Sequence, residues 1–338
     1  MLKPSVLVTG GNGYLGSILA EELDVLGYQT IVFDNCLTSL NFPSGLKDSN
    51  VSYVWGDVRD PSDLESALKG IDAVVHLAGM VGDPACNADP HLAWDINYLG
   101  TISLAQACRR VGIRRFVFAS SCSNYGLHNH QDVDEMAPLN PQSIYAQTKI
   151  QSEHYLLSLR DETFSPCILR FATLYGLSPR MRFDLAVNIM TIKAALENEV
   201  TVYGGDQWRP FLHVRDAARA IVHVLEQPSS GTSAEIYNCG SETENYRLKE
   251  LGQLIVQEVP YAKLYVVPEK VDKRSYRINF AHIQRDLNFR CTYRVIDGVR
   301  EILGAARAGL YQDFTLAKYS NYKMILSYTQ QTAELVPQ

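Results

Sequence analysis

The chain has 338 residues, of which 46% are hydrophobic and 20% are charged, and its formal net charge is −6. This composition is typical of a globular protein with a sizeable core and excludes a disordered or fibrous chain. The acidic balance argues against nucleic acid or an anionic membrane surface as the main partner.

The cysteine content and the hydropathy of the chain indicate the cellular compartment of the protein. The seven cysteines are widely spaced and include no Cys-x-x-Cys pair, which favours reduced thiols over disulfides or a structural zinc site. No segment reaches the roughly 18 uncharged apolar residues that a membrane span needs. The short apolar run near Met1 leads directly into a glycine-rich turn, which does not fit a signal peptide. We therefore expect a cytoplasmic protein with no membrane partner.

The first half of the chain alternates short apolar runs with amphipathic segments. The apolar runs are rich in Val, Ile and Phe, as strands buried on both faces should be; they cover residues 6–8, 30–33, 51–55, 73–77, 115–119 and 167–171. The amphipathic segments predict helices over 14–26, 61–69, 92–110 and 143–159. This alternation predicts an α/β fold with a Rossmann-type, doubly wound parallel sheet.

After about residue 175 the segments become longer and more polar. Further helices are predicted over 185–196, 216–226, 248–258 and 295–308, and no Gly/Ser-rich linker separates the two halves. We therefore expect one domain over 1–175, to which parts of 205–240 return. A smaller interleaved α/β domain, expected to bind the substrate, covers mainly 176–310. The sequence pattern assigns no role to the tail over 311–338.

Three glycines follow the first predicted strand. Gly10 suits a tight turn, Gly13 lets the backbone approach a pyrophosphate, and Gly16 lets the helix pack closely on the strand. The helix N-terminus offers backbone N–H groups and a favourable dipole to phosphates. The turn therefore predicts a dinucleotide-binding first domain, with Asn12, Tyr14 and Leu15 completing the contact.

Asp34 ends the second predicted strand, 18 residues after Gly16. A carboxylate there can accept hydrogen bonds from the adenosine ribose and repels a 2′-phosphate, so NAD is favoured over NADP. Other cofactor contacts are expected at the carboxyl ends of neighbouring strands, namely Asn35, Asp57, Val58, Leu77, Ala78, Gly79 and Ser120.

The fifth predicted strand ends in serines, and a Tyr-x-x-x-Lys motif follows on a helix. The i, i+4 spacing places Tyr145 and Lys149 on one helix face. A phenol has a reference pKa of about 10, and a neighbouring ammonium together with a nicotinamide cation would lower it. After a dinucleotide-binding turn and near Ser121, this motif predicts acid/base chemistry on a hydroxyl group.

In this order and at these distances, the three elements resemble the short-chain dehydrogenase/reductase superfamily. The chain is similar to its extended branch, the NAD-dependent nucleotide-sugar epimerases and dehydratases, over about residues 5–305. Further matching segments are Asn97, 170–176, 188–190, 209–216 and 272–277. The resemblance implies NAD as cofactor, a nucleoside diphosphate sugar as substrate and a homodimer formed through the helices over 92–110 and 143–159.

The resemblance also implies roles for single residues. Tyr145 would be the acid/base, Lys149 would hold the nicotinamide ribose, and Ser121 would bind the reacting oxygen. Asn97 would support the active-site backbone or a proton path. The substrate diphosphate would be held by cationic or amide groups, for which guanidinium is well suited; the candidates are Asn188, Arg209 and either Arg274 or Arg277.

Several positions depart from the family pattern. Cys122 and Ser123 stand where 4,6-dehydratases carry Asp-Glu, which argues against simple dehydration because a carboxylate must remove a carbon-bound proton. Cys122 is a candidate acid/base, although related epimerases carry the thiol at the place of Ser123. Thr173 replaces an asparagine that contacts the diphosphate in many relatives. Asp83, in the loop after the fourth strand, is a candidate sugar contact.

These features favour a nucleotide-sugar 4-epimerase that acts through a transient 4-keto sugar. The alternatives are a 4-ketosugar reductase or another dehydratase with the same residues, and, from a different class, a non-catalytic NAD-binding sensor. The His-x-His pair at 128 and 130 has no evident third ligand, so we expect a solvated loop and no metal site.

Overall fold

The computed structural model describes residues 3–39, 42, 49–227, 235–269, 272 and 274–334. A seven-stranded parallel sheet forms the centre of the molecule, with the strand order β11-β7-β5-β4-β1-β2-β3. Its strands are β1 (Ser5–Thr9), β2 (Gln29–Asp34), β3 (Val51–Trp55), β4 (Ala73–His76), β5 (Arg115–Ser121), β7 (Ser165–Phe171) and β11 (Ile236–Cys239). The order reverses at β1, which confirms the predicted Rossmann-type sheet.

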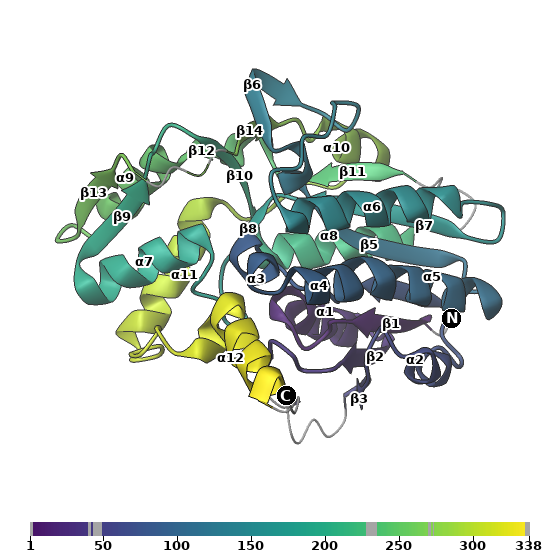
Figure 1. Ribbon diagram of the computed structural model, residues 1–338. Helices are drawn as coiled ribbons and strands as arrows, with labels where there is room; N and C mark the ends of the chain where they lie inside the picture. The colour runs from purple at the N-terminus through teal and green to yellow at the C-terminus, as the bar shows by residue number, and fades with distance from the viewer. Residues whose placement is uncertain are drawn as a thin grey trace.

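Helices cover both faces of this sheet (Figure 1). One layer consists of α1 (Tyr14–Val25) and α8 (Val214–Glu226), which pack against each other. The other consists of α2 (Pro61–Ala67), α5 (Gly100–Arg110) and α6 (Ile144–Ser158). Both layers are needed because successive side chains of a buried strand point to opposite faces of the sheet.

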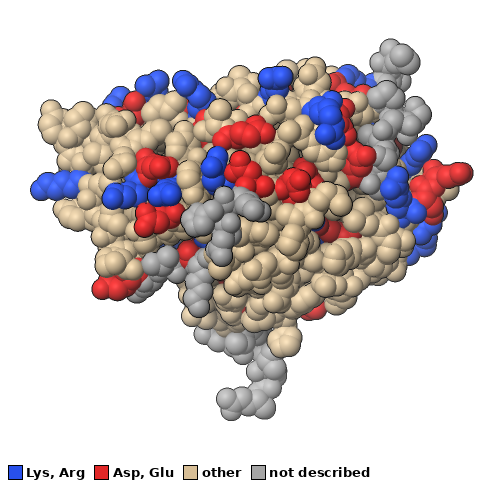
Figure 2. All heavy atoms as spheres, turned by 90° about the horizontal axis from the view of Figure 1, so that it is seen from above, with Lys and Arg blue, Asp and Glu red and all other residues tan. Residues whose placement is uncertain are grey.

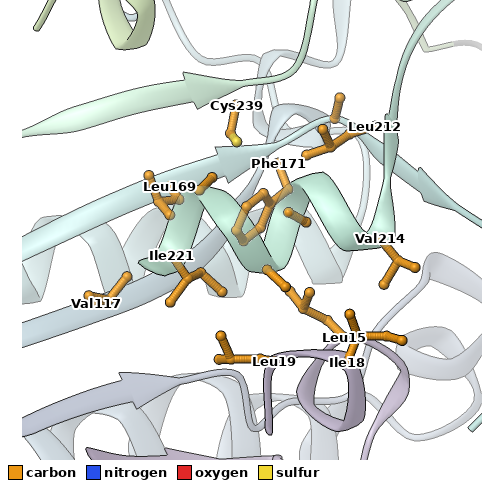
Figure 3. Packing of buried hydrophobic residues seen from close by; sticks show 14 of the residues in the cluster. Leu15, Ile18, Leu19, Val117, Leu169, Phe171, Leu212, Val214, Ile221 and Cys239 are labelled. Atoms are coloured by element: carbon orange, nitrogen blue, oxygen red, sulfur yellow. The ribbon is translucent and has the colours of Figure 1, made fainter. Parts of the chain in front are cut away.

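Strand β1 illustrates this division. Val6 and Val8 belong to the core cluster under α1 and α8, whereas Leu7 belongs to the cluster under α2, α5 and α6. In Figure 3, Ile221 of α8 lies between the sheet residues Val117 and Leu169 and the side chains of α1. The strand is apolar at nearly every position because its side chains pack into a core on each face of the sheet.

The predicted helix over 92–110 consists of three consecutive segments. An α-turn, α4 (Pro90–Trp94), continues into a π-helical turn (Asp95–Leu99) and then into α5. π-Turns often carry functional residues. Here the turn contains Asn97, whose Oδ1 accepts from the backbone N of Met80 at 2.7 Å and whose Nδ2 donates to the Met80 carbonyl at 3.0 Å. Asn97 thereby fixes the chain that leaves β4.

The second half forms a smaller α/β unit with its own core. Its main elements are α7 (Ala186–Glu197), β9 (Glu199–Tyr203), α9 (Leu248–Glu258), β13 (Lys263–Val267) and α11 (Val295–Arg307). Small sheets join it to the large one through β8 (Thr173–Tyr175), β10 (Trp208–His213), β12 (Asn245–Arg247), β6 (Leu127–Val133) and β14 (Ser275–Ile278), followed by α10 (Ala281–Leu287). Short 3₁₀ turns occur at Cys122–Tyr125, Glu242–Glu244 and Ala317–Tyr319. The domain boundaries inferred from the sequence stay predictions.

The tail contains a further helix, α12 (Asn321–Glu334), which packs against α3 (Asp83–Ala88) beside the large sheet (Figure 1). Ile325 of α12 is fully buried in a cluster with Met80, Cys86 and Ile96. The tail thus contacts the loop that follows β4.

The described surface includes strand β6 and a mixture of charged side chains (Figure 2). His128 lies in strand β6, paired with β14, rather than in the expected solvated loop, and the side chains of 129–131 lie outside the described part. Figure 2 shows acidic and basic side chains interspersed over the face that it presents. Among the described residues, no helix has both the length and the apolar character required to cross a membrane.

A buried ion pair connects α6 to the sheet. Glu153 of α6 accepts from Arg170 of β7, with Oε2 at 2.6 Å from Nη2 and Oε1 at 3.0 Å from Nε. The two side chains are 1% and 3% exposed. Glu153 also accepts from Ser120 and from Asn124, and Arg170 Nη1 donates to the Tyr125 hydroxyl at 2.9 Å. One charge pair therefore fixes α6, β5 and β7 to one another.

Replacement of one partner should destabilise the fold strongly. Arg170→Met leaves the Glu153 carboxylate buried without its counter-charge, and we expect a loss of about 3–5 kcal/mol in the free energy of unfolding. The control is the double variant Arg170→Met with Glu153→Leu. It removes both charges and should lose less free energy of unfolding than the single variant. Urea unfolding measures both. A single variant within about 1 kcal/mol of wild type would contradict this role of the pair.

Candidate active site

A cavity of about 490 Å³ lies where the carboxyl ends of β1, β2, β4 and β5 meet the second unit. Its size is typical of a small-molecule site, and its position beside the reversal in strand order is the usual ligand site of such sheets. Residues from both units line it, including α6, the segment after β8, β10 and the first residue of α12.

The glycine-rich turn forms one end of the cavity. Gly10 has φ +70°, and a Cβ there would lie 2.6 Å from the backbone N of Ala78. A Cβ on Gly16 would lie 2.5 Å from the Gly10 carbonyl oxygen. Among the described residues, no side chain caps α1 at its N-cap Gly13, so the first N–H groups of the helix are available to an anion. These residues fit the pyrophosphate of a dinucleotide.

Asp34 lines the cavity next to this turn. Its carboxylate accepts from the backbone N–H of Asn12 at 3.0 Å and of Cys36 at 2.8 Å. Burial raises the pKa of Asp34, and these hydrogen bonds oppose the shift. The carboxylate is thus fixed at the end of β2 with acceptor positions left for ribose hydroxyls.

Most of the expected cofactor contacts line the cavity, and three do not. The lining contains Gly10, Gly13, Tyr14, Leu15, Gly16, Asp34, Asn35, Val58, Leu77, Ala78, Gly79, Ser120, Tyr145 and Lys149. Asn12 instead supports Asp34, and Asp57 accepts from Asn35 at 2.9 Å and from Arg59. Asn97 lies behind the wall, where it holds Met80.

The serine, tyrosine and lysine predicted from the sequence meet at the carboxyl end of β5. Tyr145 and Lys149 lie in the first turns of α6, whose N-cap is Ser143. Lys149 Nζ donates to the Ala119 carbonyl at 2.8 Å and lies 5.9 Å from the centre of the Tyr145 ring. Ser121 and Ser123 both line the cavity, and their hydroxyl oxygens are 2.9 Å apart.

The protein alone does not lower the pKa of the phenol. Burial raises the pKa of Tyr145, followed by the effect of Cys86, and the hydrogen bond with Ser121 and the charge of Arg182 only oppose the rise. Burial also lowers the pKa of Lys149 to about 8. We expect a lower pKa when a nicotinamide cation lies beside the phenol together with Lys149, and this stays a prediction. In the protein alone, the desolvation of the phenolate outweighs the groups that lower the pKa.

Cys122 does not reach the cavity. Its side chain is 1% exposed, and its thiol donates to the Arg170 carbonyl at 3.1 Å. Burial raises its pKa. The structure therefore corrects the interpretation of Cys122 as a candidate acid/base, because the side chain points into the core from the 3₁₀ turn that follows β5.

Two of the three arginines expected to hold the diphosphate lie in the cavity lining, and the third does not. Arg209 and Arg274 line the cavity together with Thr173 and Asp83. Arg209 Nη2 lies 2.8 Å from Asp272 Oδ2, and Arg274 Nη1 lies 2.9 Å from Asp83 Oδ2. The two guanidinium groups are therefore held at the cavity by aspartates.

Two of the predicted substrate contacts lie elsewhere. Arg277 pairs with Asp132 and lies over the Trp208 ring, outside the cavity lining. Asn188 is fully buried, and its amide is used internally: Oδ1 accepts from the N of Gly176, and Nδ2 donates to Tyr14 and to the Arg182 carbonyl. The interpretation of Asn188 as a diphosphate contact is therefore corrected, because neighbouring groups use its amide. Of the two alternatives Arg274 and Arg277, only Arg274 lies in the cavity lining.

The lining also contains residues that were not predicted as site residues, among them Arg180, Arg182, Asp184 and Asn321. The first three lie within five positions of each other after β8, and such a concentration of charge in a conformationally irregular segment was a readable signal. Asn321 comes from the tail, and no sequence pattern indicated that it reaches the cavity. The expected absence of a metal stays a prediction; one group of possible ligand residues, Glu235, His282 and Asp286, lies outside the cavity lining.

Comparisons with known proteins identify the family of the chain. Residues 6–240 match the model of the NAD dependent epimerase/dehydratase family. The UDP-glucose 4-epimerase of Bacillus subtilis (strain 168) is 30% identical over 285 residues, which cover 76% of this chain and 84% of the relative. The structure of the UDP-glucose 4-epimerase of Thermus thermophilus in complex with NAD has a TM-score of 0.78 and 26% identity, over 90% of this chain and 100% of that one. MoeE5 in complex with UDP-glucuronic acid and NAD has the same TM-score at 27% identity, over 90% and 100%.

Asp34 should decide between NAD and NADP. We expect Asp34→Ser to weaken NAD binding roughly tenfold, because a hydrogen bond to a charged group contributes about 1.5–3 kcal/mol, and to improve NADP binding by removing a like charge. Titration of cofactor-free protein with each dinucleotide measures both effects. Asp206→Ser, at an exposed position outside the cavity, is the control. Tighter binding of NADP than of NAD by the unaltered chain would refute the assignment.

Proposed function

Because the chain belongs to the NAD-dependent epimerase/dehydratase family, we propose that it is a 4-epimerase of nucleoside diphosphate sugars. The observation that carries the proposal is the placement of Tyr145, Lys149 and Ser121 in one cavity with the glycine-rich turn. Positions 122 and 123 hold no carboxylate, so the base that a 4,6-dehydratase needs there is missing.

Each catalytic side chain has a defined task in this proposal. Bound NAD would supply the hydride chemistry at C4 of the sugar. Tyr145 would remove the proton of the C4 hydroxyl and return it after the 4-keto sugar has turned over. Ser121 would donate a hydrogen bond to the same oxygen, and Lys149 would favour the phenolate form of Tyr145. The turnover is redox-neutral, in contrast to that of a 4-ketosugar reductase.

The raised pKa of Tyr145 means that a further positive charge is needed before this tyrosine can act as a base. Burial holds Tyr145 as a neutral phenol, which is the form that donates a proton. To accept a proton near neutral pH, the phenol needs a positive charge beside it. Lys149 and the oxidised nicotinamide are the charges that this site can offer, so we expect the active base to form only after cofactor binding.

Arg209 and Arg274 would bind the substrate diphosphate. In the structure they pair with Asp272 and Asp83. A diphosphate offers stronger bidentate acceptors and would replace part of these contacts. Asp83 Oδ1 is buried without a hydrogen-bond partner among the described residues, which suits acceptance from a sugar hydroxyl. Thr173 lines the same wall.

Two measurements test the proposal. Mass spectrometry of the small molecules released from denatured protein should detect NAD. Incubation with a panel of nucleotide sugars should give a product of unchanged mass. Stoichiometric oxidation of NADH or NADPH with a 4-keto sugar would instead establish a reductase.

Tyr145→Phe should reduce turnover by about 10²–10⁴-fold, because that is the contribution of a positioned acid/base. NAD retention and the melting temperature should remain close to wild type. Tyr175→Phe is a matched control: the Tyr175 hydroxyl is buried, has no partner among the described residues and does not line the cavity. Its activity should remain within about threefold of wild type. Full activity of the Tyr145 variant on its substrate would disprove the assignment.

We also propose a homodimer through α5 and α6, which lie side by side on one face of the sheet (Figure 1). Leu156 is fully buried inside the subunit, whereas Leu159 is partly exposed and is the outward-facing candidate. A two-fold interface buries the same patch on both subunits.

Leu159→Glu should therefore weaken the dimer, because it places a carboxylate in an apolar contact. Sedimentation should give about twice 37.8 kDa for wild type and a lower mass for the variant. Leu196→Glu, at a 39% exposed position on α7, is the control and should remain dimeric. A wild-type mass near 37.8 kDa would rule out the dimer.

A further inference from the structure

The segment between β8 and α7 places an arginine in the cavity with two unused nitrogens. Arg182 is 7% exposed, and its Nε donates to Asp184 Oδ1 at 2.8 Å. Its carbonyl accepts from Asn188 Nδ2 at 2.9 Å, so both ends of the residue are fixed. Within the described ranges, neither terminal nitrogen of Arg182 has a hydrogen-bond or ion-pair partner.

Asp184 connects this arginine to the tail. Its second oxygen, Oδ2, accepts from the backbone N of Asn321 at 2.8 Å. Asn321 is 6% exposed, lines the cavity and donates through Nδ2 to the Val81 carbonyl at 3.3 Å. Its Oδ1 is buried without a partner among the described residues. Burial of Ile325 one turn later fixes the start of α12 in place.

Unpaired polar groups at such positions are costly. Buried donors and acceptors are almost always hydrogen-bonded, and leaving them unpaired has a substantial desolvation cost. Asn321 Oδ1 is such a buried acceptor among the described residues. Arg182, whose two terminal nitrogens have no partner there, lines the same cavity from an element far away in the chain. A ligand that fills this part of the cavity would satisfy all three.

Arg182 lies near the reacting end of the site. Its Nη2 is 3.9 Å from the place of a Cβ on Gly82, the residue before Asp83 at the start of α3. Burial raises the pKa of both Tyr145 and Tyr276; the charge of Arg182 opposes the rise at Tyr145, whereas Arg209 and Arg274 oppose it at Tyr276. The arginine is therefore separate from the pair that would bind the diphosphate.

We propose that Arg182, Asp184 and Asn321 form a specificity subsite for a carboxylate on the sugar, which makes a nucleoside diphosphate uronic acid the preferred substrate class. The proposal rests on the proposed function, since it assumes that the sugar lies beside Tyr145. The two Nη groups of Arg182 bind the carboxylate in a bidentate manner, and Asn321 Oδ1 accepts from a neighbouring hydroxyl. Asp184 is a positioning residue, because it fixes the guanidinium and the start of α12.

The test compares two compounds that differ only at this carboxylate, UDP-glucuronic acid and UDP-glucose. Calorimetric titration and turnover should both favour UDP-glucuronic acid, by about 100-fold in kcat/KM. Arg182→Met should reduce this value about 100-fold for the acid and less than about tenfold for UDP-glucose, for which only the effect of the charge on Tyr145 is lost. Arg182→Lys, which keeps the charge but not the bidentate geometry, should fall between wild type and Arg182→Met.

Asp184→Asn and Asn321→Leu test the supporting contacts. Both should raise KM for UDP-glucuronic acid about tenfold and leave kcat nearly unchanged, because they disturb binding and not proton transfer. Arg300→Met, which breaks only the pair with Glu258 on the surface, is the control and should change neither value. Melting temperature and NAD retention are measured for every variant, so that loss of fold or cofactor is recognised.

Three results would overturn the subsite. One is a wild-type chain that binds UDP-glucose as well as UDP-glucuronic acid, or that binds neither. Another is an equal loss for both sugars in Arg182→Met. The third is loss of NAD in the same variant, which would assign the arginine to a cofactor phosphate. Failure of the proposed function is distinguishable: tight binding of the acid that depends on Arg182, with no epimerised product, would refute the 4-epimerase and keep the subsite.

Discussion

The buried pair between Glu153 and Arg170 determines where the chemistry of this chain can occur. Tyr145, Lys149 and Glu153 follow one another at i, i+4 and i+8, so they share one face of α6. The pair fixes that face against β5 and β7. Burying two charges has a large desolvation cost, so the pair contributes little net free energy of folding. It does fix α6 in one position on the sheet. The Glu153 carboxylate also favours the charged form of Lys149, which burial opposes.

The cavity contains more charge than a neutral ligand would need. Arg209 and Arg274 pair with Asp272 and Asp83 across its wall, and Arg182 pairs with Asp184. These aspartates hold the guanidinium groups in place, so that less side-chain entropy is lost when an anion binds. A ligand with several negative groups fits this arrangement, and α12 contributes to the same wall through Asn321.

Local patterns predicted the parts of the site that depend on a few neighbouring residues. The glycine triplet, Asp34 and the Tyr-x-x-x-Lys motif are each defined by one turn or one helix, and the structure places Gly10, Asp34 and Tyr145 in the cavity lining. The helix over 92–110 was predicted as an element, but its π-turn was not, because no periodicity separates the two winding patterns within a few residues.

Residues whose role depends on distant contacts were misplaced or missed. Asn188 and Arg277 match family positions, yet Tyr14 and Asp132 take up their polar groups. Cys122 follows a strand end at the cavity but points into the core. Asn321 meets Asp184 across 137 positions of sequence, and only the folded chain shows that contact.

In the proposed reaction, Tyr145 serves an oxidation and a reduction of the sugar at the same carbon. The most direct measurement uses a nucleotide sugar labelled with deuterium at C4 and enzyme with its retained NAD, without added reductant. We expect the epimerised product to keep the whole label at C4 and no dinucleotide to be consumed. Loss of the label to water, or its appearance in free reduced dinucleotide, would contradict the proposed reaction.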